Sequence, residues 1–349
     1  MVGKVSPGDS EYDREAALVL IRKQAEQGTL QQRGVRALGA PFPKATPEHG
    51  YYGIPLLEEP AWTWEIPLYF FVGGAAGSAA VIATAAEWVG DDIQLARNAR
   101  WVSLAGISIS SLLLISDLGR PERFLAMLRV FKPQSPMSMG AWILASFGTF
   151  TGAAVTSDLI CDKGADLLPI RLVGGLAKAL SSLFALPFSN YTGVLIGATA
   201  IPVWNNNVGS LPIHFGMSGL QSAVSVLELL GHADNGALNS LGIGSAAWET
   251  LEGVLLEGRQ DPILEPLKRG KSGWVTRVGG LLSGPVPLAL RLAAAVSGKR
   301  TSRKLRRWAA LAGIAGSLFT RYGWVMAGSA SVKQTAGTLP IPPERNNRS

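Results

Sequence analysis

The sequence predicts an all-α polytopic membrane protein, and three observations support this class. Of the 349 residues, 47% are hydrophobic and only 16% are charged, and the mean hydropathy of +0.22 is too apolar for an ordinary soluble domain. Several apolar runs are long enough to cross a hydrocarbon core of about 30 Å as helices. The Lys and Arg residues behind the net charge of +7 cluster between these runs, as juxtamembrane charges do. This clustering, without a basic aromatic module, argues against a nucleic-acid partner.

The cysteine and histidine content limits the cofactors that the protein can hold by itself. A single cysteine, Cys161, excludes an internal disulfide and a self-contained iron–sulfur cluster. The three histidines, His49, His214 and His232, do not supply the facing pairs that a membrane cytochrome b needs. We therefore expect no haem and no metal in this protein.

Eight spans are predicted in order along the sequence. Residues 1–60 are expected to form an extramembrane tail and an interfacial segment, because no apolar core of signal-peptide length precedes Tyr51. Residues 331–349 form the expected C-terminal tail. Pro187 predicts a kink in the fourth span, and Pro285 and Pro287 interrupt the seventh. The spans are predicted at residues 66–88, 101–117, 139–158, 176–202, 211–230, 238–256, 275–296 and 308–330.

The basic residues suggest an orientation. An even number of spans leaves both termini on one side of the membrane. The densest basic cluster, KRTSRKLRR at residues 299–307, directly precedes the last span on the opposite side. Because cytoplasmic loops carry an excess of Lys and Arg, this cluster favours external termini.

The entry to the first span combines aromatic residues with a carboxylate. Trp62, Glu65 and Tyr69 lie at i, i+3 and i+7, so a helix that begins by Trp62 places them on one face. Pro67 fits a helix start there. Tryptophan and tyrosine are common at membrane interfaces, but a carboxylate at this level is costly without a partner or a task. These residues therefore form either a plain aromatic belt at the membrane interface or a functional site. The carboxylate of Glu65 favours a functional site.

Asp117 ends the second span immediately before Arg120 and Arg123. Ser103, Ser110 and Asp117 recur every seven residues and so share one helix face, which we expect to point into the bundle. An ion pair from Asp117 to one of the two arginines would fix the loop. The same pair could form one wall of a ligand site, and the sequence leaves both roles open.

The fifth span carries a polar stripe on an otherwise apolar helix. Spacings of four, three, four, three and four residues place these side chains on one face: His214, Ser218, Gln221, Ser225, Glu228 and His232. With water between them, they could carry protons across the membrane; the alternative is hydrogen bonding between helices. Glu249 and Glu252 in the sixth span are candidates for the rest of such a path, and an ion pair with Arg321 would keep one of them charged.

The small residues 73–80, GGAAGSAA, predict close helix packing. Gly73 and Gly77 have the small-xxx-small spacing that lets helices approach in a membrane. A nucleotide-binding loop is excluded because the segment lies inside an apolar helix and follows no strand.

Four groups of motifs stand out along the sequence: YYGIPLLEEP with WEIPLYFFVGGAAG, DLGRPERFLAML, KPQSPMSMGAWIL and NYTGVLIGATAIPVW. Together they resemble the NrfD/PsrC family, the membrane subunits of polysulfide-reductase-like respiratory complexes. The resemblance covers residues 51–230 strongly and the rest weakly. It implies two four-helix bundles, which we place at residues 61–207 and 208–330, without haem, and a quinone site near the face where an iron–sulfur partner docks.

The resemblance also implies which residues meet the quinone, menaquinone or ubiquinone, in the first bundle on the side of the N-terminus. Glu65, Asp117 and Tyr191 would exchange protons, although Tyr191 without the resemblance is a packing residue. The full set of expected quinone-site residues is Trp62, Glu65, Tyr69, Asp117, Arg120, Asn190 and Tyr191.

The function implied is a multi-pass subunit of the bacterial inner (cytoplasmic) membrane that exchanges electrons between an iron–sulfur subunit and the quinone pool. A catalytic subunit, often one with molybdopterin, would complete the complex, and proton translocation is a further expectation. Two rival functions remain: a proton or ion transporter without a redox role, and a passive membrane anchor.

Overall fold

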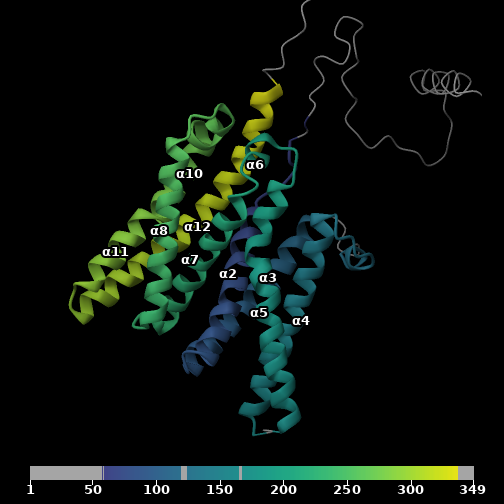
Figure 1. Cartoon of the computed structure of the whole chain (residues 1–349), viewed down its shortest axis with the longest axis vertical. Helices are drawn as coiled ribbons and strands as arrows, with labels where there is room; N and C mark the ends of the chain where they lie inside the picture. Colours follow the sequence, from purple (N-terminus) through teal and green to yellow (C-terminus); the bar gives the residue numbers. More distant parts are fainter. Residues whose placement is uncertain (1–56, 58, 119–123, 165–166, 337–349) are drawn as a thin grey trace, which may run out of the picture. The chain divides into compact units, whose positions relative to one another are not determined.

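The fold is described by a computed structural model for residues 57, 59–118, 124–164 and 167–336. This part of the protein is helical and contains no β-strand, as the sequence predicts (Figure 1). Five of its segments are long and apolar enough to cross a membrane: α2 (Glu65–Trp88), α3 (Ile93–Asp117), α4 (Pro136–Asp162), α5 (Leu168–Gly197) and Gly270–Ala295. The protein is therefore a multi-pass membrane protein.

Three further long helices do not combine this length with this apolar composition. Helix α7 (Leu211–Leu227) has 17 residues and continues into a π-helical turn, η3 (Glu228–His232). Helix α8 (Gly236–Gly258) carries Glu249 and Glu252, and α12 (Lys299–Ala336) carries Arg321.

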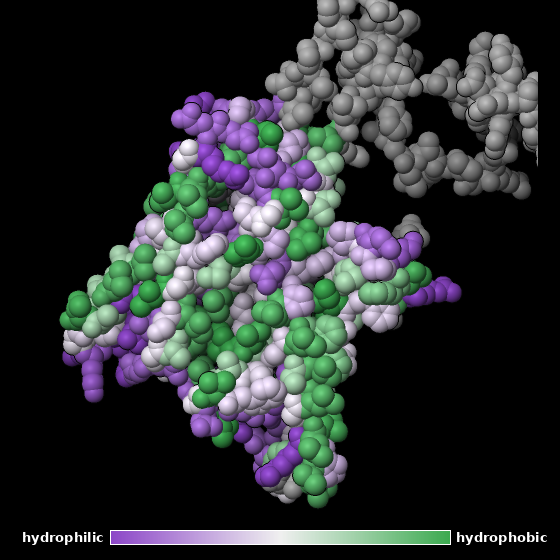
Figure 2. Space-filling view, in the orientation of Figure 1, coloured by the Kyte–Doolittle hydropathy of each residue, from purple (hydrophilic) through white to green (hydrophobic). Residues whose placement is uncertain are grey.

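Apolar side chains are exposed along the outer faces of the helices. On α5, Leu172, Leu176, Leu183 and Leu186 each have more than half of their surface exposed. Figure 2 shows broad hydrophobic areas over the helices, as expected of surfaces that face lipid.

Glycines allow α2 to approach its neighbours closely. A Cβ atom on Gly73 would lie 3.2 Å from the Phe188 ring of α5, and one on Gly77 would lie 2.8 Å from the Ala185 carbonyl oxygen. The predicted packing role of this small-residue pair is confirmed. On another face of α2, Gly74 meets Gly219 of α7, so α2 contacts both α5 and α7.

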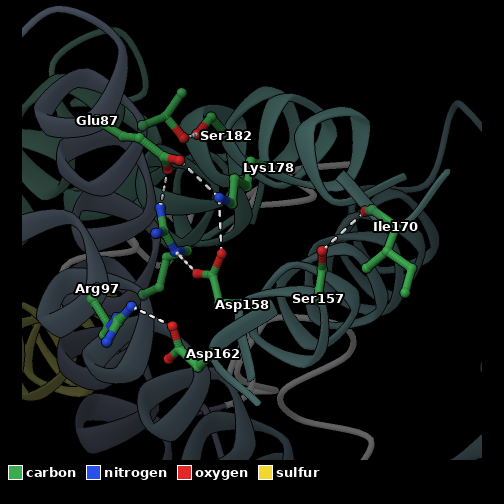
Figure 3. Close-up of polar contacts among 10 residues, drawn as sticks. Glu87, Arg97, Ser157, Asp158, Asp162, Ile170, Lys178 and Ser182 are labelled. Carbon is green, nitrogen blue, oxygen red and sulfur yellow. Dashed lines mark hydrogen bonds and ion pairs between the residues drawn. The ribbon is translucent and has the colours of Figure 1, made fainter. Parts of the chain in front are cut away.

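The connection between α4 and α5 is shorter than predicted. The sequence leaves residues 159–175 between the third and fourth predicted spans, but α4 continues to Asp162 and α5 begins at Leu168. Ser157 donates to the Ile170 carbonyl at 3.1 Å and joins the two helix ends (Figure 3). Helix α5 is one helix through Pro187, as predicted. A four-residue helix, α6 (Pro202–Asn205), follows it.

The seventh predicted span is broken at Gly284. Helix α10 (Gly270–Ser283) ends there and α11 (Pro285–Ala295) begins, in line with the expected effect of Pro285 and Pro287. The last helix is longer than predicted because the basic cluster at residues 299–307 is its first part and not a loop.

Four alternating charges tie α2, α3, α4 and α5 together at the end of α2 opposite Glu65. Arg100 donates to Glu87 at 2.5 Å and to Asp158 at 2.6 Å, and Lys178 contacts the same two carboxylates at 2.8 Å each. Figure 3 shows Glu87, Asp158 and Lys178 converging, with Arg97 and Asp162 paired beside them. Each of the four helices contributes one charge, so this charged ring fixes their far ends.

Arg100→Gln should destabilise the protein, because it leaves Glu87 and Asp158 with Lys178 alone. The Arg100 side chain is only 8% exposed, so we expect a loss of about 3 kcal/mol, the lower end for a broken buried pair. Unfolding of the purified protein in mixed micelles measures the change. Arg97→Gln is the matched control, because its pair with Asp162 is exposed and should contribute less than about 1 kcal/mol. Equal losses in the two variants would contradict the role of the charged ring.

Candidate functional site

The entry to α2 is held by stacked tryptophans. The Trp62 ring stacks on Trp204 with centroids 5.2 Å apart and planes 15° from parallel. Trp204 is fully buried, and its Nε1 donates to the Trp324 carbonyl of α12 at 2.7 Å. One face of the Trp62 ring is therefore covered by the Trp204 ring.

Two carboxylates lie at this end of the first helices. Glu65 is the first residue of α2 and is half-buried, where the helix dipole favours a negative charge. It accepts a hydrogen bond from Thr63 Oγ1. Asp117 is the last residue of α3, also half-buried, and lies within electrostatic range of Glu65. Tyr322 of α12 donates to the Trp64 carbonyl at 3.0 Å beside them.

Two buried tyrosines complete the same site. Tyr69, one turn along α2 from Glu65, is 3% exposed and packs against the Phe70 and Phe188 rings at 5.7 and 6.5 Å. Tyr191 of α5 is 7% exposed and lies within electrostatic range of Tyr69. Its hydroxyl donates to the Pro136 carbonyl at the start of α4.

Gly140 makes room for Tyr191. A Cβ atom on Gly140 would lie 2.2 Å from Cζ of the Tyr191 ring, so a larger residue at this position of α4 would displace the ring.

The structure thus brings together four of the predicted quinone-site residues, which we call the entry site: Glu65, Tyr69, Asp117 and Tyr191. Asn190 lies elsewhere: its Nδ2 donates to the Leu186 carbonyl at 2.9 Å, and its Oδ1 contacts Gly216 of α7. Arg120 and Arg123 lie outside the described residues, so the predicted ion pair with Asp117 stays a prediction. Ser103 and Ser110 of α3 are fully buried on the face predicted to point inward.

The polar stripe of α7 is buried along its length. His214, Ser218, Gln221, Ser225 and Glu228 are all buried, and half-buried His232 ends the stripe with a 2.8 Å hydrogen bond to Asn98. Several of its polar atoms have no hydrogen-bond partner among the described residues: His214 Nε2, Ser218 Oγ, Gln221 Nε2 and Ser225 Oγ. Buried polar atoms in this condition are usual positions for ordered water.

The predicted glutamates lie at the start of this stripe. His214 Nδ1 is 2.8 Å from Glu252 and 3.8 Å from Glu249. Glu249 also accepts a hydrogen bond from Ser283 of α10 at 3.0 Å. The three residues His214, Glu249 and Glu252 line a cavity of about 700 Å³ between α7, α8, α10 and α12, whose other walls are mainly apolar. This cavity was not predicted from the sequence because residues from several separate helices line it.

Arg321 does not pair with either glutamate, which corrects the predicted ion pair. Its guanidinium lies 3.8 Å above the Phe215 ring centroid, and its Nη2 donates to the Phe215 carbonyl at 2.6 Å. His214 occupies the position next to the glutamates, so the arginine interacts with α7 instead.

A fully buried ion pair was also not predicted. Arg291 of α11 makes a two-pronged contact with Glu228, at 2.6 and 2.9 Å, and both side chains are 0% exposed. Such paired geometry is characteristic of strong arginine–carboxylate contacts. The available signal was Arg291 itself, a cation inside a predicted span.

The structure defines a multi-pass membrane protein with internal ionisable groups. Carboxylates and tyrosines lie at one end of α2–α5, and a buried polar stripe runs along α7. Residues 56–234 match the family described as "Polysulphide reductase, NrfD". Because this match covers more than half of the sequence, the protein belongs to that family, which confirms the resemblance seen in its motifs.

One similar protein is the C subunit of the polysulfide reductase of Wolinella succinogenes, which is 28% identical over 187 residues. The match spans 49% of the present sequence and 58% of that protein, less than two thirds of the relative's length. The family match includes the entry site and the α7 stripe, whereas Glu249, Glu252, Arg291 and Arg321 lie beyond it. Within the described residues, no group of three or more His, Cys, Asp or Glu side chains is arranged to hold a metal ion.

Proposed function

We propose that the protein is the membrane subunit of a respiratory oxidoreductase complex that exchanges electrons between an iron–sulfur subunit and the quinone pool. Family membership, the name of the Wolinella succinogenes relative and the apolar helices support this proposal. A catalytic subunit with a molybdopterin cofactor completes the proposed complex. We place the protein in a bacterial cytoplasmic membrane, with eight spans in two four-helix bundles and external termini.

The entry site is the proposed quinone site. The observation that supports this most is that Glu65, Asp117 and two tyrosines lie together at one end of α2–α5. Conversion of quinone to quinol takes up two protons and two electrons, so a site needs proton donors beside an apolar slot. The two carboxylates would exchange protons with water at the membrane surface. The Tyr191 hydroxyl would exchange its hydrogen bond with Pro136 for one to a quinone oxygen, and Phe70 and Phe188 would supply apolar wall.

A second proposed activity, proton transfer, rests on the α7 stripe. Its unpartnered polar atoms extend from His214 towards the Glu228–Arg291 pair. Water molecules bound to these polar atoms would connect Glu252 and His214, at one end of the stripe, with the Glu228–Arg291 pair at the other. The same stripe would serve a transporter without a redox role, so the activity of the whole complex must distinguish the two functions.

Purification from native membranes through a tag on this protein tests the proposal. We expect an iron–sulfur protein and a quinone to co-purify, identified by electron paramagnetic resonance and by solvent extraction with mass spectrometry. A protein that purifies alone, carries no quinone and conducts protons in liposomes would contradict the proposal and support the transporter.

A further inference from the structure

The first turns of α12 form an exposed basic surface beside the apolar surface of the protein. Six of the nine residues at positions 299–307 are Lys or Arg, and the structure makes them part of one helix with the span that follows. In Figure 2, hydrophilic side chains at the lower left, where α11 joins α12 in Figure 1, border a hydrophobic area.

Two of these cations are held by the protein. Arg303 pairs with Asp234, and this hydrogen bond lowers the pKa of the Asp234 carboxyl, which keeps the pair ionised. Arg306 donates to the Ala233 carbonyl at 2.8 Å. Both side chains therefore contact the turn between α7 and α8, where they fix the start of α12.

Three other cations, Arg300, Lys304 and Arg307, are exposed and form no ion pair with the part of the protein that the structure describes. Their spacing of four and three residues places them on one helix face. Since no acidic residue among the described ones pairs with this face, it retains its positive charge.

The same face continues directly into apolar surface. Trp308 and Leu311 follow Lys304 and Arg307 at spacings of four residues, with exposed fractions of 64% and 47%. Val296, at the end of α11, is 90% exposed nearby in sequence. Tryptophan is typical of the membrane–water boundary, so the cations lie at the level of lipid headgroups and the apolar residues at the level of the acyl chains.

We propose that Arg300, Lys304 and Arg307, with Trp308, form a binding site for an anionic phospholipid. The cations would contact the headgroup phosphate, and Trp308 and Leu311 would pack against the upper part of an acyl tail. Charge complementarity favours this occupant, because an anionic lipid satisfies both the charged part and the apolar part of one continuous helix face. The proposal is independent of the quinone site.

Quenching of Trp308 fluorescence by brominated lipid tests the site in the full-length protein. The protein is reconstituted in phosphatidylcholine vesicles containing brominated phosphatidylglycerol or, separately, brominated phosphatidylcholine. Subtracting the signal of Trp308→Phe isolates the contribution of Trp308. We expect phosphatidylglycerol to quench Trp308 more strongly than phosphatidylcholine does at equal mole fraction, with a preference that falls as salt rises.

The triple variant Arg300→Gln/Lys304→Gln/Arg307→Gln should remove this preference, since each cation near an anionic lipid surface contributes about fivefold in affinity. The control is Arg129→Gln/Lys132→Gln/Lys271→Gln, which removes the same charge at exposed positions distant in sequence and should keep the preference. Equal quenching by the two lipids in the wild type would overturn the proposal. The proposal would also be overturned if the triple variant kept the lipid preference but lost a co-purifying acidic protein. That result would identify the surface as a protein-docking site. Displacement of the lipid by inorganic phosphate alone would also overturn it, in favour of a soluble-anion site.

Discussion

Asp117→Asn is expected to lower the quinone-linked turnover of the purified complex by about 100-fold or more, the usual contribution of a positioned acid or base. The amide keeps the size of the side chain but does not exchange a proton at neutral pH. The rate of quinol oxidation with an artificial electron acceptor, or of quinone reduction with an artificial electron donor, measures the effect. Asp162→Asn is the control, because Asp162 is exposed in a pair with Arg97 at the other end of α4. Turnover within twofold of the wild type in Asp117→Asn would remove Asp117 from the proposed chemistry.

Glu65→Gln provides a second test of the same site. Glu65 and Asp117 lie within electrostatic range, so we expect the two carboxylates to act as one proton-exchanging unit. The double variant Glu65→Gln/Asp117→Asn should then be little slower than the worse of the two single variants. Multiplicative losses would indicate two independent roles.

The other large effect is expected at the buried pair of Glu228 and Arg291. Arg291→Met leaves a fully buried carboxylate without its partner, which should cost about 3–5 kcal/mol of stability. Glu228→Leu in the same protein should recover most of the loss, because an apolar pair of similar volume is often neutral. Unfolding of the purified variants in mixed micelles gives both values.

Arg303→Met is the matched control for this pair, since its ion pair with Asp234 is exposed. It should change stability much less than Arg291→Met does. A double variant as unstable as Arg291→Met would show that the arginine is required for more than neutralising Glu228.

The fold class followed from hydropathy because lipid requires long helices in which every backbone group is satisfied. The positions of some helix ends did not follow from hydropathy. Lys and Arg are good helix formers, so the basic residues 299–307 extend α12 although their charge resembles a loop. For the same physical reason, the helical start of α5 at Leu168 includes Arg171 and precedes the apolar run.

Glu65 and Asp117 were singled out from the sequence because each is a carboxylate at the end of an apolar run. Tyr191 lies inside an apolar run and was expected at the site only from the resemblance to the NrfD/PsrC family. The partners of these residues did not follow from the sequence. Tyr191 donates to a carbonyl of α4, and His214 rather than Arg321 meets Glu252. These choices depend on which helices are adjacent and how they are rotated. The charged ring of Glu87, Arg100, Asp158 and Lys178 was missed for a related reason: its charges lie at the ends of separate runs, and only packing brings them together.

Quinone binding by the purified protein tests the central proposal most directly. Titration with a quinone analogue, followed by tryptophan quenching, compares the wild type with Glu65→Gln, Tyr191→Phe and the cavity variant Glu252→Gln. We predict that the first two variants weaken binding by about tenfold, the loss of one good hydrogen bond, while Glu252→Gln leaves binding unchanged. Weaker binding in Glu252→Gln alone would contradict the account and place the quinone in the cavity between α7, α8, α10 and α12.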